Sequence, residues 1–130
     1  MKKLVYRPLF CGGTVLLYLL LIMSTAGEQL AGVWLTAKRD SQIQIVENTD
    51  GTFSGKIIWT APNVRSYVGV QVLKGVVYNK GADSYTCPWV YDPKMGVTAS
   101  GVANISHDTL YIRAHKGFLS KTEFFTRVKR

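Results

Sequence analysis

The chain has 130 residues and carries 16 lysines and arginines against 8 aspartates and glutamates, a formal net charge of +8. The basic residues are scattered and form no stripe with interleaved aromatic side chains, so the sequence gives little support for nucleic-acid binding. A chain of this length indicates one domain, large enough to bury a core without disulfides.

Residues 1–26 have the pattern of an N-terminal signal peptide. Three basic residues precede an apolar core that is densest between Val15 and Met23, and the small residues Ser24-Thr25-Ala26 follow. A membrane anchor is the alternative, but Leu9 to Met23 is only 15 residues, whereas a membrane span needs about 20 apolar residues. We therefore predict cleavage after Ala26, export to the periplasm or out of the cell, and a single mature domain over 27–130.

Cleavage would remove three of the 16 basic residues, leave a net charge of +5, and leave one cysteine, Cys87. A single cysteine cannot form an internal disulfide. We expect the Cys87 side chain to be buried and inert. Trp89 and Tyr91, two and four residues further along, are expected to share its strand face.

The mature sequence consists of short runs of alternating or β-branched residues separated by turn residues, which is typical of β-strands. No segment shows ten or more residues of helical periodicity, so we expect little helix. The expected strands, in chain order, lie near residues 32–38, 42–45, 53–59, 70–78, 85–91, 97–105, 109–115 and 122–128.

Four strands carry features with structural consequences. In the third, the alternation predicts one face made of Phe53, Gly55, Ile57 and Trp59. The fourth is half-interrupted at Lys74-Gly75, and the fifth contains Pro88, which cannot donate to a ladder and therefore predicts an edge or a bulge. In the sixth, small residues share one face and permit another backbone or a bulky ring to approach closely; they are Ala99, Gly101 and Ala103.

About eight short strands connected in chain order describe an all-β meander. We predict that it closes into a small antiparallel up-and-down β-barrel, because closure removes exposed strand edges. Gly32-Val33-Trp34-Leu35 resembles the opening of lipocalin-type barrels, in which the tryptophan plugs one end and an arginine of the last strand packs across its ring. Arg127 is placed to do this. Twelve aromatic residues in the mature chain predict a mostly packed lumen, with any pocket small and near one mouth.

Several short motifs in a fixed order resemble a bacterial exported family known as domain of unknown function 2147. The most distinctive is Trp89-Val90-Tyr91-Asp92-Pro93-Lys94-Met95-Gly96, where Asp92 is expected to bond the backbone ahead, Pro93 to preset φ, and Gly96 to adopt the left-handed conformation. The others are Gly32-Val33-Trp34-Leu35, Gly55-Lys56-Ile57-Ile58-Trp59, Leu110-Tyr111-Ile112-Arg113, Gly117-Phe118 and Phe125-Thr126-Arg127.

This resemblance covers nearly the whole mature chain and implies a lipocalin-like barrel in the periplasm or outside the cell, with no established activity. The sequence departs from the family in two places. The loop at Ala61–Tyr67 is shorter than is usual in the family, and Cys87-Pro88-Trp89 replaces small residues before the Tyr-Asp-Pro turn. If relatives hold a ligand through the long loop, this chain lacks that site.

Catalytic and metal-binding patterns are weak. Ser106-His107-Asp108 is interpreted as a turn, because adjacent side chains point apart and cannot relay a proton among themselves. His107, His115 and Cys87 lack the spacing of a zinc site. We therefore predict no metal, no cofactor and no enzymatic activity.

Four residues are candidates for ligand binding: Trp59, Trp89, Tyr91 and Arg113. Rings with a polar edge suit a half-hydrated barrel mouth. For Arg113, two registers are open. If Leu110 and Ile112 face the core, Arg113 faces solvent; in the reverse register it points into the lumen and requires an anionic partner.

The leading functional hypothesis is an exported, non-enzymatic barrel that binds a small apolar or amphipathic molecule in the cell envelope, with membrane contact only through the cleaved leader. The alternative is an envelope protein–protein interaction module with a filled, non-binding barrel core. A third hypothesis, an envelope enzyme, requires Arg113, His115 and a carboxylate to converge in one cleft.

Overall fold

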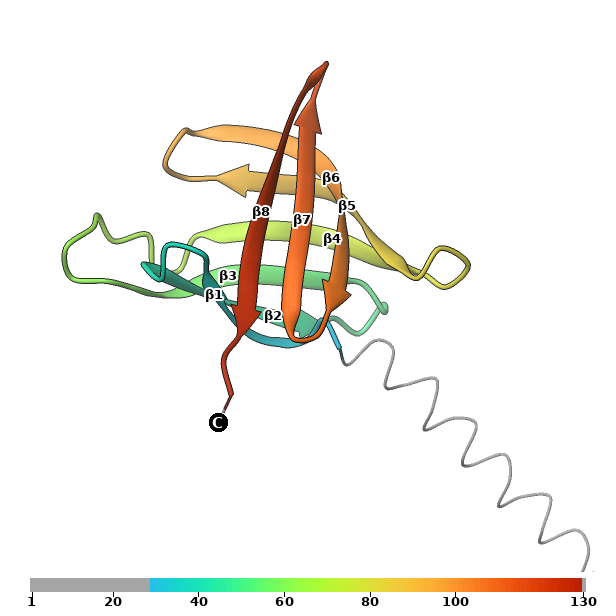
Figure 1. Cartoon of the computed structure of the whole chain (residues 1–130), viewed down its shortest axis with the longest axis horizontal. Coiled ribbons are helices and arrows are strands. Elements are labelled where there is room, and N and C mark those ends of the chain that lie inside the picture. Colours follow the sequence, from blue (N-terminus) through green and yellow to red (C-terminus); the bar gives the residue numbers. More distant parts are fainter. Residues whose placement is uncertain (1–28, 130) are drawn as a thin grey trace, which may run out of the picture.

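The computed structural model describes residues 29–129, which form a closed antiparallel β-barrel whose strands follow one another in chain order (Figure 1). The predicted all-β up-and-down barrel of about eight strands is confirmed. The described part of the chain contains no helix that could cross a membrane. The predicted signal peptide lies outside the described residues. The strands are β1 (Gly32–Thr36), β2 (Ser41–Glu47), β3 (Phe53–Thr60), β4 (Gln71–Asn79), β5 (Ser84–Asp92), β6 (Val97–Ser106), β7 (Thr109–Lys116) and β8 (Leu119–Arg127).

The barrel closes at the predicted pair of residues. Trp34 of β1 is the register partner of Arg127 of β8, and the Cζ atom of Arg127 lies 4.3 Å from the centroid of the indole ring. Trp34 is fully buried, and its Nε1 donates a hydrogen bond to the Leu30 carbonyl at 2.9 Å. Arg127 also pairs through Nε with Asp108 Oδ1 at 3.2 Å and donates from Nη1 to the Ala31 carbonyl. One arginine therefore ties the last strand to the β6–β7 turn and to the segment before β1.

Two glycines allow close approach of other groups. Gly32 has a φ of +143°, and a Cβ atom there would lie 3.1 Å from Nη1 of Arg127. At Gly101 a Cβ atom would lie 2.3 Å from the Arg113 carbonyl oxygen, which belongs to the neighbouring strand β7. The prediction that the small residues of the sixth strand admit another backbone is therefore confirmed at Gly101.

A register shift in the β2–β3 pair changes the face of Trp59. Ile43 pairs with Ile57, but Gln42 pairs with Trp59, so β3 carries one extra residue between these two pairs. Because Ile43 and Ile57 face the core, Trp59 faces outward and is 40% exposed. The prediction that Trp59 shares a face with Ile57 is wrong for this reason.

Pro88 lies in a second bulge, as predicted. Cys87 pairs with Gly101 whereas Val90 pairs with Ala99, so β5 gains one residue around the proline. The inner face therefore passes from Cys87 to Val90, which packs against the core. The prediction that Trp89 and Tyr91 share the face of Cys87 is wrong, because the extra residue reverses the alternation.

The outward Trp89 ring stacks on Tyr91 with a centroid distance of 5.7 Å, and Lys74 Nζ lies 4.4 Å from the Trp89 centroid. Lys74 and Trp89 are register partners across β4 and β5. The predicted irregularity at Lys74-Gly75 is also present, since Gly75 has a φ of +63° and the β3–β4 register shifts between Phe53 and Gly55. These contacts place Trp89 on the outer wall of the barrel.

The packed core fills the end of the barrel that Trp34 closes. Phe53 and Tyr85 meet edge to face at 5.9 Å between centroids, and Tyr78 lies 5.0 Å from Tyr85. Burial, the largest cause, together with nearby negative charge, raises the pKa of Tyr85 to about 12. The remaining large buried side chains of this end are apolar, so the packed half contains no buried charged side chain among residues 29–129.

Strand β8 extends beyond its partner β1. Only Trp34, Leu35 and Thr36 pair with β8, at Arg127, Thr126 and Phe125. Within residues 29–129, the segment Leu119–Phe124 therefore pairs with β7 alone. The β7–β8 hairpin projects past the other strands at the top of Figure 1. Closure thus leaves this stretch of the β8 edge unpaired near the open end, contrary to the expectation that closure removes exposed strand edges.

Cys87 is buried, as predicted, and burial raises the pKa of its thiol to about 12. Because the thiolate is the reactive form, we expect the native protein at pH 8 to react with Ellman's reagent at least about a hundredfold more slowly than the urea-unfolded protein. Absorbance at the released thiolate band measures both rates. Rapid stoichiometric reaction of the native protein would contradict the buried position.

Candidate functional site

A cavity of about 830 Å³ occupies the end of the barrel opposite Trp34. Its lining includes the β1–β2 and β5–β6 connections and the ends of β7 and β8, so it opens at the mouth that these segments surround. The predicted position near one mouth is confirmed. The size is larger than expected and lies within the range of roughly 300–1,000 Å³ that is typical of small-molecule sites.

The deep wall of the cavity is apolar. Six different strands contribute one inward-facing side chain each. We call them the apolar floor; they are Ile43, Ile57, Leu73, Val90, Ile112 and Phe125. All except Val90 are buried. A surface of this kind favours hydrocarbon over water.

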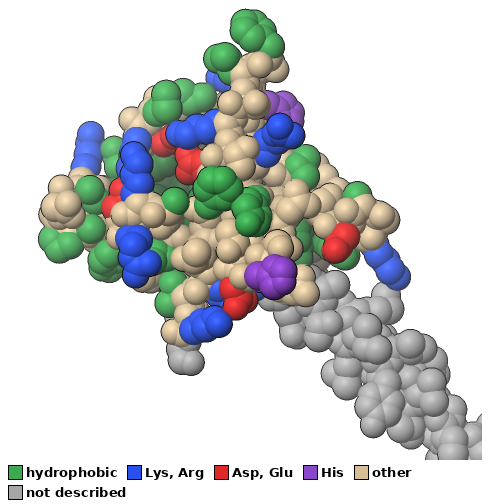
Figure 2. Space-filling model, in the orientation of Figure 1, with side chains coloured by type: hydrophobic (Ala, Val, Ile, Leu, Met, Phe, Trp, Pro, Cys, Tyr) green, Lys and Arg blue, Asp and Glu red, His purple; other side chains and the backbone are tan. Residues whose placement is uncertain are grey.

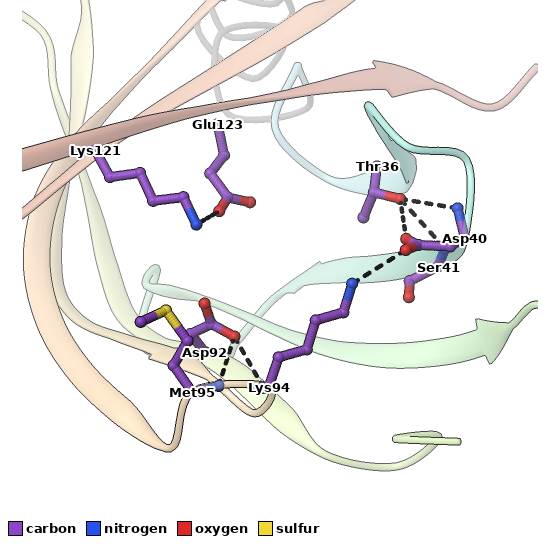
Figure 3. A network of polar contacts seen from close by, with 8 residues as sticks. All are labelled: Thr36, Asp40, Ser41, Asp92, Lys94, Met95, Lys121 and Glu123. Atoms are coloured by element: carbon purple, nitrogen blue, oxygen red, sulfur yellow. Dashed lines mark hydrogen bonds and ion pairs between the residues drawn. The ribbon is translucent and has the colours of Figure 1, made fainter. Parts of the chain in front are cut away.

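Charged side chains surround the opening of the cavity above this floor (Figure 3). Lys94 Nζ lies 3.0 Å from Asp40 Oδ2, and Lys121 Nζ lies 2.9 Å from Glu123 Oε2. Asp92 lies close enough to Lys121 for its charge to contribute to the raised pKa of that lysine, of which the hydrogen bond to Glu123 is the main cause. We call these five residues the ionic rim.

Two features place the ionic rim over the cavity. Glu123 and Lys121 are the register partners of Ile112 and Ala114, which face inward, so both charged residues lie on the inner face of β8. Lys94 reaches from the β5–β6 turn to the β1–β2 turn, and these turns stand on opposite sides of an eight-strand ring. The Lys94–Asp40 ion pair therefore spans the mouth.

Asp40 is held by its own turn as well as by Lys94. Thr36 Oγ1 donates to Asp40 Oδ1 at 2.8 Å and accepts a hydrogen bond from the Ser41 backbone N–H at 3.2 Å. Burial by itself would raise the pKa of Asp40, but the hydrogen bonds from Lys94 and Thr36 and the charge of Lys94 together outweigh it, and the pKa is lowered. Asp40 is therefore ionised throughout the neutral range.

The turn that carries Lys94 forms as predicted. Asp92 Oδ1 accepts hydrogen bonds from the backbone N–H groups of Lys94 at 2.9 Å and Met95 at 3.4 Å. Gly96 has a φ of +67° and donates its N–H to the Asp92 carbonyl at 2.7 Å. These hydrogen bonds fix the backbone at Lys94, so its side chain starts from a defined position and its ammonium group reaches across the opening.

The lowered pKa of Asp40 predicts a pH-dependent contribution to stability. A carboxylate whose pKa is lowered by folding stabilises the fold at pH values above its ordinary pKa of 3.8. This contribution is lost as the pH falls through the lowered pKa of the folded state. We expect Asp40→Asn to lower the unfolding free energy at pH 7 by about 0.5–1 kcal/mol, and this difference to vanish near pH 2. Thermal unfolding at both pH values measures it, with the exposed Glu47→Gln as the control. A difference that persists at pH 2 would contradict the ion-pair explanation.

The structure separates the four residues that the sequence offered as a ligand-binding group. Tyr91 is among the residues that border the cavity near its mouth, although its ring stacks on the outward Trp89 ring, whereas Trp59 and Trp89 do not border it. Arg113 faces outward, because Leu110 and Ile112 are buried, so the register with Arg113 in the lumen is wrong. Only one of the four therefore contributes to the cavity.

Arg113 and His115 line a shallow depression on the outer wall together with Val102, Asn104 and Ser120. No carboxylate belongs to this lining. The convergence of Arg113, His115 and an acid that an enzyme hypothesis requires is therefore not present in this depression.

Sequence reasoning missed the ionic rim, although part of its signal was available. In the closing strand, Lys121 and Glu123 alternate in phase with Arg127, which was expected to pack across the ring of Trp34. The predicted strand began at residue 122, so Lys121 was assigned to a loop. The Lys94–Asp40 pair joins residues 54 positions apart and had no local signal.

Comparison with known proteins gives one match. A family model described as "Uncharacterized protein conserved in bacteria (DUF2147)" matches residues 32–127. This range runs from the first residue of β1 to the last residue of β8 and so includes the barrel closure, the apolar floor and the ionic rim. No curated protein and no solved structure matches the chain.

Proposed function

The chain belongs to the DUF2147 family of bacterial proteins, and we propose that it is a non-enzymatic binding protein of the cell envelope whose barrel holds a small amphipathic molecule. The observation that carries this proposal is the cavity of about 830 Å³ with an apolar floor beneath an ionic rim. The hydrocarbon part of the ligand would lie on the floor, and its polar head would lie among the rim side chains.

The rim favours an amphipathic ligand over a wholly apolar one. Lys94 and Lys121 offer ammonium donors, and Asp40, Asp92 and Glu123 offer carboxylate acceptors. A wholly apolar molecule that filled the mouth would remove water from these charges without replacing its hydrogen bonds, which is costly. A polar head that bonds to the rim avoids that cost.

The floor predicts how affinity depends on chain length. Burial of each CH₂ group contributes about 0.8 kcal/mol, which corresponds to a factor of about four in affinity. We expect the dissociation constant to fall three- to fourfold for each added methylene until the floor is covered. Beyond that length, further methylenes would extend into water and add nothing.

Competition with a fluorescent lipophilic dye tests the proposal. The mature chain is titrated with the dye, which is then displaced by decanol, decanoate and longer homologues. Ala114→Phe places a ring in the cavity and should weaken dye binding at least about tenfold, whereas the matched Val102→Phe on the outer wall should leave it unchanged. The absence of saturable dye binding, or equal loss in both variants, would reject the proposal.

The envelope location rests on the leader pattern of residues 1–26. We expect the mature protein in the periplasmic or extracellular fraction, with an N-terminus after Ala26. N-terminal sequencing of the fractionated protein measures both. Retention of the full-length chain in the cytoplasm would contradict this part of the proposal and leave ligand binding unaffected.

The second candidate function is an envelope protein-interaction module. The free edge of β8 over Leu119–Phe124 favours it, because unpaired strand edges accept a strand from a partner. Under this alternative the cavity is incidental. Dye binding that fails, together with capture of an envelope protein that Thr122→Pro abolishes, would favour the interaction module over the binding protein.

A further inference from the structure

The tip of the β7–β8 hairpin carries two large apolar side chains that are mostly exposed to water. Phe118 is 97% exposed and Leu119 is 69% exposed. The hairpin projects beyond the barrel in Figure 1, and hydrophobic side chains form the apex of that projection in Figure 2. Large apolar side chains held this far from any core are typical of an interaction site.

A tight turn fixes these side chains in place. Lys116 pairs with Leu119, so only Gly117 and Phe118 connect the two strands. Gly117 has a φ of +62°, as the first central position of a two-residue type II′ turn requires. Phe118 is therefore presented at the apex by a hairpin whose strands pair up to the turn.

Basic residues stand on both strands behind the apex. His115 and Lys116 precede the turn, and Lys121, which is paired with Glu123, follows it. Lys116 forms no ion pair with any residue in the described range. Figure 2 shows Lys or Arg and His side chains just below the hydrophobic apex.

We propose that this tip docks on the surface of an anionic lipid bilayer, with Phe118 and Leu119 in the interfacial region and Lys116 beside the lipid phosphates. An apolar apex with a basic collar matches the order in which a bilayer presents hydrocarbon and negative charge. A protein partner would require a surface of about 800 Å² on each side, which the two-residue convex tip does not provide without the adjoining edge of β8.

The tip also adjoins the mouth of the cavity. Lys116, Leu119 and Lys121 belong to the cavity lining, so docking would bring the mouth close to the lipid surface. This contact is additional to the one expected through the cleaved leader. It does not depend on the proposed ligand, because the exposed apex and the basic residues are present whether or not the cavity is filled.

Vesicle binding of the mature chain, residues 27–130, tests the proposal. All eight strands and the core lie within this range, and the leader is left out because it would bind vesicles by itself. We expect sedimentation with vesicles of phosphatidylcholine and phosphatidylglycerol, and weaker sedimentation with phosphatidylcholine alone. The double variant Phe118→Ser/Leu119→Ser should lower the partition coefficient at least about tenfold. The matched control Val46→Ser/Val77→Ser, at half-exposed positions on the outer wall, should not change it.

A second set of variants locates the contact. Phe118→Trp should show a blue-shifted emission and quenching by brominated lipid relative to the unsubstituted protein, whereas Val77→Trp should show neither. Lys116→Glu should weaken binding severalfold, only to the anionic vesicles and only at low salt. The cavity variant Ala114→Phe should bind vesicles normally even if it no longer binds dye.

Three results would overturn the proposal. The first is absence of vesicle binding by the mature chain. The second is loss of vesicle binding in Ala114→Phe, which would mean that lipid enters the cavity and that the tip does not dock. The third is a tip variant that binds vesicles normally but loses self-association or a protein partner in light scattering, which would assign Phe118 to a protein interface.

Discussion

Replacing Trp34 with alanine is expected to lower the free energy of unfolding by about 3–5 kcal/mol. The indole is fully buried, donates to the Leu30 carbonyl and lies under the Arg127 guanidinium. Its removal leaves a cavity at the closed end and removes the contact across the β1–β8 seam. Since a domain of about 100 residues has a total stability of only about 5–15 kcal/mol, urea unfolding should show a large shift of the midpoint.

Trp59→Ala is the matched control for this prediction. The same side chain is deleted, but Trp59 faces outward and is 40% exposed. We expect a loss of about 1 kcal/mol, less than half of the loss at Trp34. Equal losses at the two positions would contradict the assignment of Trp34 as the residue that seals the barrel.

Gly101→Ala is expected to destabilise the barrel by about 3 kcal/mol, at the upper end of the range for overpacked sites. The added Cβ would lie 2.3 Å from the Arg113 carbonyl oxygen and 2.9 Å from Ala114 Cα. Both atoms belong to the backbone of β7, so no side chain can rotate away. The two strands must separate, and their pairing must weaken.

Gly81→Ala provides the control. No atom lies within 4 Å of the position that its Cβ would occupy, and its φ is not positive. The substitution should be neutral or should stabilise the protein by up to about 1 kcal/mol, because alanine restricts the unfolded chain. Denaturation of the two alanine variants in parallel separates the steric effect at Gly101 from the general effect of a glycine substitution.

The fold could be predicted because most of its determinants are local. Alternating residues fixed the strands, and turn residues such as Asp92, Pro93 and Gly96 fixed the connections. The closing pair is not local, since Trp34 and Arg127 lie near the two ends of the described sequence; its prediction depended on a known pattern of residues. The structure confirms the strands, the turn at Asp92–Gly96 and the closing pair.

The candidate site could be predicted only in part, because bulges depend on how strands pair. A bulge adds one residue to one strand, and every later side chain changes face. Pro88 indicated where a bulge would lie but not its consequence for Trp89, and nothing in β3 marked the shift before Trp59. Two of the aromatic residues offered as site residues therefore lie on the outer wall.

The same two bulges explain why the barrel is hollow at one end. Several aromatic side chains expected to fill the lumen lie elsewhere: Phe53 and Tyr85 pack at the closed end, and Trp59 and Trp89 lie on the outer wall. Apart from Phe125, the floor of the cavity is aliphatic, and small side chains such as Val90 and Ala99 line the mouth half. They are too small to meet across the barrel, and the cavity is the space that they leave.

The ionic rim as a whole could not be predicted, because barrel closure brings the Lys121–Glu123 pair of β8 together with rim residues from other segments. Asp40, Lys94 and Glu123 lie on different connections or strands, far apart in the sequence. Each one by itself resembles an ordinary solvated surface residue. The β1–β8 pairing brings these segments around one opening, and the function proposed for the barrel depends on that arrangement.

A titration of the isotope-labelled mature chain with decanoate, followed by methyl NMR, tests the binding proposal most directly. The binding proposal predicts saturable chemical-shift changes for the floor methyl groups of Ile57, Leu73, Val90 and Ile112. The methyl signals of Val46 and Val77, on the outer wall, should not change. Methyl groups of the floor that do not shift at saturating decanoate, or shifts confined to the outer wall, would contradict it.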